Sequence, residues 1–160
     1  MIFYIEHDSP LGHLLIGASS TGICGIYFEE HKHFRGKDGW QHAPDHPHLR
    51  AGVKQLDEYF SRQRQRFTLP LDLAGTPFQR AVWQQLEAIP FGESITYSQQ
   101  AQRLGNPGAS RAVGSANGRN PVSIVVPCHR VIGASGAVTG YAGGLERKRY
   151  LLALEGIVLR

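Results

Sequence analysis

The chain has 160 residues, of which 41% are apolar and 19% are charged, and its formal net charge at pH 7 is +4. That length allows one compact domain or two small ones, and the apolar share is enough for a real core. The longest apolar runs are far shorter than a membrane span, and the start of the chain lacks the features of a secretory signal. We therefore expect a soluble, cytoplasmic protein with no membrane contact.

The charge is unevenly distributed along the chain. Residues 1–75 hold eight basic and nine acidic side chains, whereas residues 76–160 hold nine and four, so the second half carries a net charge of +5. A polyanionic partner such as DNA fits this asymmetry, although a solvated basic face is the commoner explanation of so modest an excess.

Residues 2–28 alternate apolar and polar side chains in the manner of strands, with turn residues at 8–12 and 19–22. This pattern predicts a three-stranded antiparallel meander. Cys24 falls in the third strand, where a small buried side chain is its expected role. A reducing compartment disfavours a disulfide with Cys128, so both cysteines are interpreted as thiols.

Residues 29–48 are polar and hold five of the eight histidines. Such a cluster could bind zinc or nickel, but glycines and prolines interrupt it, so we interpret the segment as a solvated, poorly ordered loop and assign it no metal. The five are His31, His33, His42, His46 and His48.

The segment 47–62 has apolar residues at helical spacing and predicts a helix packed on the meander. Residues 67–73 follow as an extended connector, and Gly75 begins the second half. We therefore expect an N-terminal α/β domain over residues 1–74 and a C-terminal domain over residues 75–160.

Thr76 and Pro77 have the chemistry of a helix start. The apolar stripe of this helix, which we expect to lie in the core, is Phe78, Val82, Trp83 and Leu86. Two short helices are predicted next, at 96–104 and 109–118, separated by a Gly-Asn-Pro-Gly turn. The pair suggests a helix-turn-helix whose second helix is rich in small residues.

Cys128 lies in the run Ser-Ile-Val-Val-Pro-Cys-His-Arg-Val-Ile, residues 123–132. The apolar β-branched residues predict a buried strand that Pro127 ends, with the cysteine at its exit. A thiol is a poor nucleophile at neutral pH unless a cationic or basic neighbour lowers its pKa, and His129 and Arg130 follow directly. The alternative is an inert buried thiol.

This run, together with residues 75–83 and 89–92, resembles the O6-alkylguanine-DNA alkyltransferase family, in particular its bacterial members, from about Gly75 to Gly156. The resemblance implies a mixed α/β (α+β) fold. Its N-terminal domain would be a ribonuclease H-like three-stranded antiparallel sheet with a helix. Its C-terminal domain would be mostly helical and contain a helix-turn-helix.

The resemblance also implies the function. A methyl or other alkyl group would pass from O6-alkylguanine, and from O4-alkylthymine, in double-stranded DNA to Cys128. The base would be flipped out through a minor-groove helix-turn-helix, and each molecule would act once. No metal or organic cofactor and no obligate protein partner are implied, and we expect a monomer that could bind DNA cooperatively.

The resemblance assigns roles to three groups of residues. The proton relay would run from Cys128 through water to His129 and Glu155, with Asn120 as a hinge. The DNA-binding set is Tyr97, Arg111, Ala112, Ser115 and Arg119, in which Tyr97 presses on a phosphate and Arg111 replaces the flipped nucleotide. The base pocket is Pro127, Val131, Tyr141, Ala142 and Gly143.

In the last predicted helix, residues 145–154, we expect leucines 151, 152 and 154 to face inward, and Arg147, Lys148 and Arg149 to face solvent or DNA.

Three other functions make different predictions. A lesion-binding relative without transfer would lack the cysteine. A sequence-specific regulator would need long polar side chains on its recognition helix. A cysteine hydrolase would turn over repeatedly.

Overall fold

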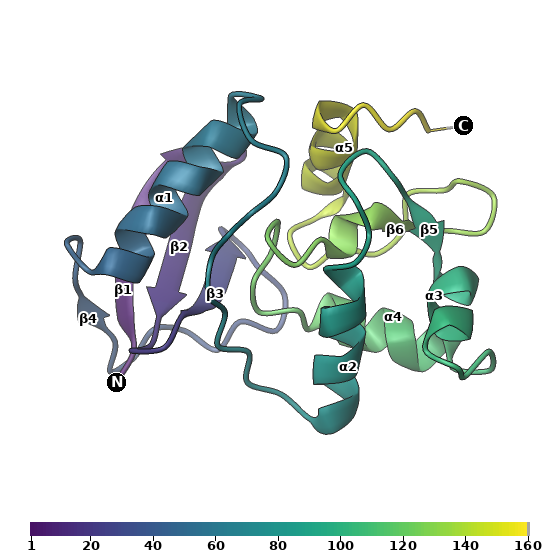
Figure 1. Ribbon diagram of the computed structural model, residues 1–160, viewed down its shortest axis with the longest axis horizontal. Helices are drawn as coiled ribbons and strands as arrows, with labels where there is room; N and C mark the ends of the chain where they lie inside the picture. The colour runs from purple at the N-terminus through teal and green to yellow at the C-terminus, as the bar shows by residue number, and fades with distance from the viewer. Residues whose placement is uncertain (160) are drawn as a thin grey trace. The chain divides into compact units, whose positions relative to one another are not determined.

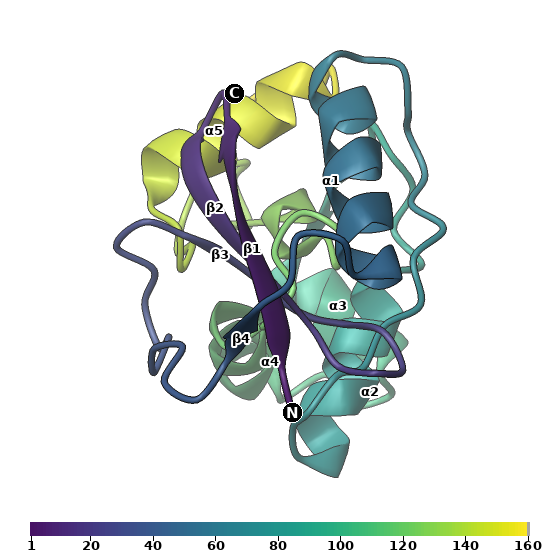
Figure 2. The same ribbon diagram turned by 90° about the vertical axis from the view of Figure 1, so that its left-hand side faces the viewer.

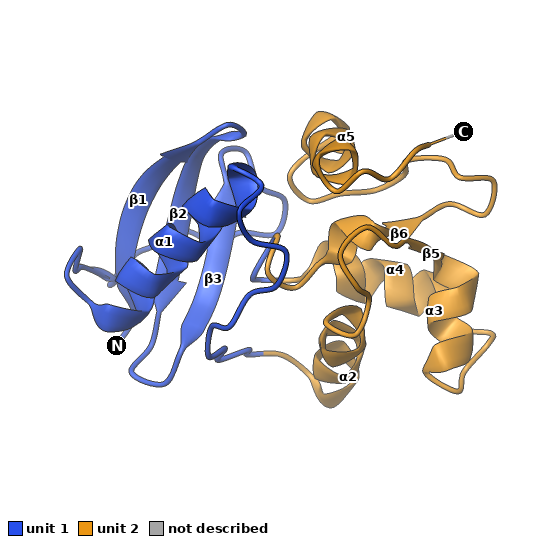
Figure 3. Ribbon diagram, turned by 45° about the horizontal axis from the view of Figure 1, so that its top comes forward, with its two compact units in different colours: residues 1–74, 121–123 blue, residues 75–120, 124–160 orange. Residues whose placement is uncertain are grey.

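The computed structural model describes residues 1–159 and divides into two compact units (Figure 3). Unit 1 comprises residues 1–74 and 121–123, and unit 2 comprises residues 75–120 and the chain from residue 124 onward. Within the described residues, no helix has both the length and the apolar character needed to cross a membrane.

Unit 1 is built on the predicted antiparallel meander, which is confirmed (Figure 1). Its strands are β1 (Phe3–Ser9), β2 (Gly12–Ala18) and β3 (Ile23–Phe28). A short fourth strand, β4 (Gln41–His42), pairs in parallel with β1, so the sheet order is β3-β2-β1-β4. The sequence did not predict β4.

Helix α1 (Pro47–Phe60) packs on one face of this sheet (Figure 2). Proline at its first turn and a hydrogen bond from the His48 amide to the His46 ring begin the helix. A Cβ at Gly52 would lie 3.4 Å from the Ile23 side chain, so the small residue lets α1 approach the sheet closely.

The opposite face of the sheet contacts the segment that was expected to be a solvated loop, and most residues of this segment are exposed and lie outside helices and strands, as expected. The Phe34 ring stacks on Tyr27 with centroids 4.1 Å apart, and a Cβ at Gly17 would meet the Trp40 ring at 3.0 Å. These aromatic contacts anchor the segment to the sheet at two points. Among the described residues, no group of three or more His, Cys, Asp or Glu side chains is placed to hold a metal ion.

The outer edge of β3 is occupied by two segments from later in the chain. The Ile23 amide donates to the Pro70 carbonyl at 2.8 Å, and the Ile26 amide donates to the Pro121 carbonyl at 2.9 Å. These bonds pair main-chain amides of the edge strand β3, which could otherwise pair with a strand of another chain. The second segment directly precedes the run that contains Cys128.

Unit 2 is mostly helical, as predicted. Its elements are α2 (Pro77–Leu86), β5 (Ile95–Thr96), α3 (Tyr97–Arg103), α4 (Ser110–Gly118), β6 (Val131–Ile132) and α5 (Leu145–Leu154), with β5 and β6 paired in parallel. Thr76 and Gln79 form a capping box at the start of α2. Trp83 is buried as expected, but Phe78 is 39% exposed, so its assignment to the core was wrong.

The helices α3 and α4 are joined by a buried amide pair. Gln100 Nε2 donates to Asn117 Oδ1 at 2.9 Å, and Asn117 Nδ2 donates to Gln100 Oε1 at 2.8 Å. Trp83 Nε1 also donates to the Ala116 carbonyl at 2.8 Å, which ties α2 to α4. These bonds fix α4, which its own glycines would leave weak.

Gln100→Ala is expected to lower the free energy of unfolding by about 2–4 kcal/mol, because it leaves both amide atoms of Asn117 buried without partners. Urea denaturation measures this change. Gln102→Ala is the matched control, since Gln102 is exposed on the same helix and should change stability by less than about 0.5 kcal/mol. Equal losses in the two variants would contradict the role of the pair.

The predicted strand at residues 123–126 is wrong. This segment is a turn in which Ile124 has φ +74°, and Cys128 begins a 3-10 helix over Cys128–Arg130. A β-branched residue in the left-handed region is strained by about 1–3 kcal/mol, so the surrounding packing must hold it. An apolar run indicates burial, and burial does not distinguish a strand from an irregular buried segment.

Candidate functional site

Cys128 is enclosed in unit 2, with 7% of its surface exposed. It follows Pro127 at the start of the 3-10 helix. Burial raises the pKa of the Cys128 thiol, while a hydrogen bond with Asn120 and the positive charge of Lys148 act in the opposite direction without cancelling the rise. The cation that lowers this pKa is Lys148 and not Arg130, and because burial outweighs its effect, the thiol needs a base to take its proton.

Asn120 holds the turn that carries the cysteine. Its Nδ2 donates to the Val126 carbonyl at 2.7 Å, and the residue is 3% exposed. This bond spans the strained residue Ile124 and closes the turn between α4 and Cys128. The bond ties these two parts together, and the hinge role of Asn120 stays a prediction.

His129 and Glu155 form a buried pair. His129 Nε2 lies 2.6 Å from Glu155 Oε2, and both side chains are inaccessible to solvent. An ionised carboxylate only accepts hydrogen bonds, so a neutral imidazole must carry its proton on Nε2. The other ring nitrogen, Nδ1, is buried and has no hydrogen-bond partner among the described residues, which leaves its lone pair available to accept a proton.

The two ionisation states are set by the surroundings. Burial lowers the pKa of His129, and the bond to Glu155 only partly offsets this effect. Burial alone would raise the pKa of Glu155, but the bonds and charges of its partners outweigh it and lower the pKa to about 2. At neutral pH the site therefore holds a neutral imidazole beside an ionised carboxylate.

Arg130 points toward Glu155. Its Nε donates to Glu155 Oε1 at 2.7 Å and its Nη2 to Oε2 at 3.1 Å, while Nη1 donates to the Ile89 carbonyl at 2.5 Å. The guanidinium is 6% exposed. Its adjacency to Cys128 in the sequence suggested a direct effect on the thiol, but its hydrogen bonds are with the carboxylate and a carbonyl.

Lys148 was expected on a solvent or DNA face, and this expectation was wrong because the residue is fully buried. Its Nζ donates to the carbonyls of Thr139 at 2.7 Å and Gly140 at 3.3 Å. Burial lowers its pKa to about 8, and the nearby Cys128 opposes that shift. Spacing could have revealed this position, since residues 148, 151, 152 and 155 recur at three- and four-residue intervals.

Tyr97 contacts the same loop. Its hydroxyl donates to the Thr139 carbonyl at 2.9 Å, and Lys148 Nζ lies 5.8 Å from the centre of its ring. Burial raises the pKa of the phenol, and Cys128 is close enough to add to the rise. Tyr97 and Lys148 thus converge on one carbonyl beside the cysteine.

The DNA-binding residues proposed on α4 share one face. Arg111, Ala112, Ser115 and Arg119 are exposed, whereas Val113, Ala116 and Asn117 point inward. The exposed face carries cations at its two ends and small side chains between them. A small-residue face of this kind lets backbone approach a narrow groove.

The remaining site residues lie on both sides of the cysteine in the chain. Pro127, Val131 and Gly143 are buried, and Tyr141 and Ala142 are half-buried. Arg147 Nη1 donates to the Gly143 carbonyl at 3.0 Å, and this bond ties the loop at residues 141–144 to the start of α5.

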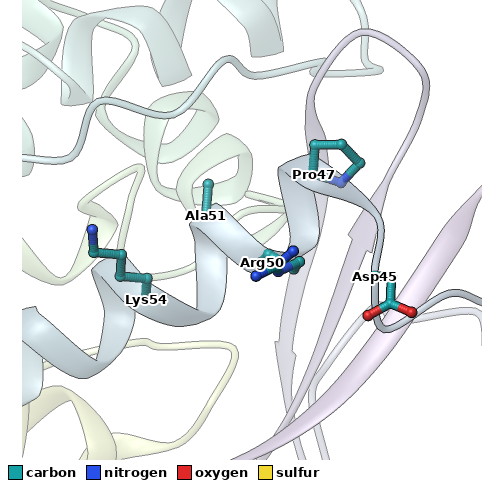
Figure 4. A pocket seen from close by; sticks show the side chains of 5 residues that line it. All are labelled: Asp45, Pro47, Arg50, Ala51 and Lys54. Carbon is teal, nitrogen blue, oxygen red and sulfur yellow. The ribbon is translucent and has the colours of Figure 1, made fainter.

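A cavity of about 370 Å³ lies on the outer side of α1 in unit 1 (Figure 4). Its lining residues are Asp45, Pro47, Arg50, Ala51 and Lys54. This set contains no nucleophile and no base that is neutral and buried, so we do not assign the chemistry to it.

Two family models match this chain. Residues 2–73 match the ribonuclease-like domain of 6-O-methylguanine DNA methyltransferase, and residues 77–157 match the DNA binding domain of 6-O-methylguanine DNA methyltransferase. These matches confirm the resemblance and the mixed α/β fold class expected from the sequence.

Similar proteins match over nearly their whole length. A methylated-DNA–protein-cysteine methyltransferase of Mycolicibacterium paratuberculosis is 47% identical, over 97% of this chain and 93% of its own. The constitutive methylated-DNA–protein-cysteine methyltransferase of Bacillus subtilis is 44% identical, over 98% and 97%. The crystal structure of Mycobacterium tuberculosis OGT in complex with DNA is 44% identical over 96% of this chain and 92% of that one, with a TM-score of 0.90.

Proposed function

Since this chain belongs to the 6-O-methylguanine DNA methyltransferase family, we propose that it repairs double-stranded DNA by moving the alkyl group of O6-alkylguanine onto Cys128. The observation that carries the proposal is a buried thiol next in the chain to a buried imidazole that a carboxylate holds at 2.6 Å. O4-alkylthymine presents a similar alkyl–oxygen bond and is proposed as a second substrate.

The transfer is a single displacement. Cys128 Sγ attacks the alkyl carbon, an S–C bond forms, and the C–O6 bond breaks with its electron pair going to the purine. The thiol proton passes through a bridging water to His129 Nδ1, and Glu155 stabilises the imidazolium. The purine finally takes up one proton, so guanine and a protein thioether are the products. No side chain proposed here can hydrolyse a thioether, so each molecule acts once.

The purine that leaves needs hydrogen-bond donors, because it takes the electron pair of the broken C–O6 bond. We assign this role to Tyr141 and to the main-chain amides of residues 142 and 143, with Pro127 and Val131 as walls of the base pocket, since the Gly144 amide already donates to the Tyr141 carbonyl at 2.9 Å. Ala142 has no hydroxyl, so main-chain donors supply the contact to O6. The nucleophile, the base and the donors are all protein groups, so the proposed step requires no metal or organic cofactor.

The DNA is engaged by the exposed face of α4. In this proposal Arg111 enters the base stack, Tyr97 presses on the phosphate beside the target, and Ala112, Ser115 and Arg119 contact the groove. Residues 75–160 would hold the DNA-binding and transfer functions, and residues 1–74 the supporting α/β domain. We propose a monomer in the cytoplasm, where DNA is the substrate and thiols stay reduced.

Arg111→Ala is expected to slow transfer from a duplex by about 10- to 100-fold, because extrusion of a nucleotide costs a few kcal/mol that the arginine helps to offset. Single-turnover rates with an O6-methylguanine duplex measure this effect. The same variant should react normally with free O6-benzylguanine, which needs no extrusion. Arg50→Ala, an exposed arginine on α1, is the control and should match the wild type with both substrates. A loss of rate with the free base would contradict the assignment.

The proposed function is tested by counting alkyl groups lost from DNA. A duplex with one O6-methylguanine is incubated with limiting protein and digested, and the nucleosides are quantified. We expect one guanine restored per protein molecule and no methanol released. Conversion beyond one equivalent would indicate a hydrolase, and tight binding without conversion would indicate a lesion-binding protein. Cys128 already disfavours the latter.

A further inference from the structure

The Arg130 guanidinium is held more firmly than a simple ion pair requires. Besides two hydrogen bonds to Glu155, it donates to the Ile89 carbonyl and lies with its central carbon 5.9 Å from the centre of the Phe91 ring. The segment after α2 therefore holds the guanidinium in addition to the carboxylate. A lysine could not reproduce this arrangement, because one ammonium group does not span both carboxylate oxygens and a carbonyl.

The Glu155 carboxylate accepts hydrogen bonds from two side chains, His129 and Arg130, and from one main-chain amide. Oε2 accepts from His129 Nε2 at 2.6 Å and from Arg130 Nη2 at 3.1 Å, while Oε1 accepts from Arg130 Nε and, at 3.4 Å, from the Gly92 amide. The carboxylate charge is thus divided between a permanent cation and the imidazole. Without Arg130, the carboxylate charge would act on the imidazole alone and would raise the pKa of His129. The imidazolium form would then be favoured, and it cannot accept the thiol proton.

We propose that Arg130 is a positioning residue that keeps Glu155 ionised and His129 neutral, so that His129 Nδ1 can accept the Cys128 proton. This inference rests on the proposed function, since it concerns the same proton relay. Among residues 1–159, three charged groups act on the His129 ring: Glu155, Arg130 and Lys148. Both cations lower the pKa of His129 and the carboxylate raises it, so loss of Arg130 would shift the balance toward the imidazolium.

The test is the pH dependence of the single-turnover reaction with free O6-benzylguanine, which removes DNA contacts from the measurement. For the wild type we expect a rate that falls on acidification only below pH 6.5, the ordinary pKa of histidine. In Arg130→Met the acid limb should move up by about one pH unit, with a loss of up to about fourfold at pH 7 and nearly full recovery at pH 8.5. Arg130→Lys keeps a cation, so its limb should stay near that of the wild type.

Arg149→Met removes an exposed arginine from α5 and should leave the profile unchanged. A purely structural role for Arg130 would lower the rate equally at every pH, so an unmoved limb in Arg130→Met would overturn the inference while the proposed function stood.

If Arg130→Met does not fold, nitrogen-15 NMR of the histidines in the wild type supplies an independent test. We expect His129 to be neutral at pH 7, with its proton on Nε2. An imidazolium at pH 7 would overturn the inference. Because this titration needs no substrate, it remains decisive even if the wild type transfers no alkyl group, which would refute the proposed function alone.

Discussion

Cys128→Ser is expected to abolish alkyl transfer while the variant still binds a duplex that contains O6-methylguanine. A serine hydroxyl keeps its proton and is a far weaker nucleophile than a thiolate, so the rate should fall by about 10⁴-fold or more. Transfer is followed by loss of O6-methylguanine from the DNA, and binding by a gel-shift titration. The substitution exchanges one small side chain for another in a buried turn, so the fold should persist.

The matched control is Cys24→Ser. Cys24 lies half-buried in β3 of unit 1, whereas the imidazole of His129 and the carboxylate of Glu155 belong to unit 2, so Cys24 should play no part in the reaction. This variant should consume one equivalent of O6-methylguanine at the rate of the wild type. Alkyl transfer by Cys128→Ser, or loss of transfer in Cys24→Ser, would contradict the assignment of Cys128 as the nucleophile.

Glu155→Gln is expected to lower the transfer rate by about 10²- to 10³-fold and the free energy of unfolding by about 3–5 kcal/mol. The amide leaves the buried Arg130 cation uncompensated, and it offers one acceptor where two donors converge. Without the negative charge, the imidazolium that forms during the reaction is no longer stabilised. Single-turnover kinetics and urea denaturation at pH 7 measure the two losses.

The pH dependence of stability distinguishes this carboxylate from others. The pKa of Glu155 is lowered in the folded protein to about 2 from an ordinary 4.5, so its contribution to stability is complete above pH 4.5 and is lost as the pH falls toward 2. The stability advantage of the wild type over Glu155→Gln should therefore shrink across that window. Glu146→Gln, an exposed acid in the first turn of α5, should show little difference at any pH. An advantage that stays constant down to pH 2 would contradict the shared-carboxylate geometry.

Much of the fold could be predicted from periodicity. The alternation in residues 2–28 gave the meander, and the three- and four-residue spacing gave α1, α2 and the helix pair α3–α4. Periodicity could not predict features that depend on side-chain packing. The loop before β4 contacts the sheet through aromatic rings such as Phe34 on Tyr27, and the turn before Cys128, which was predicted as a strand, has Ile124 in the left-handed region.

The candidate site could likewise be predicted from the sequence only in part. The pairing of His129 with Glu155 was reached through the family resemblance, and the structure places these side chains 2.6 Å apart. The partners of Arg130 were not accessible, because Ile89 and Glu155 are distant in sequence and neither position carries a local signal for this contact. The burial of Lys148 could have been predicted, since its spacing from Leu151, Leu152 and Glu155 indicates the buried face of α5. The prediction of an exposed side chain rested on its charge alone.

The most direct test of alkyl transfer to Cys128 is the intact mass of the protein after incubation with an O6-methylguanine duplex, followed by peptide mapping. We expect a gain of one methyl group per molecule, confined to the peptide that contains Cys128, with no further gain when excess duplex is supplied. An unchanged mass while the DNA is converted, or a methyl group on any other residue, would contradict the account.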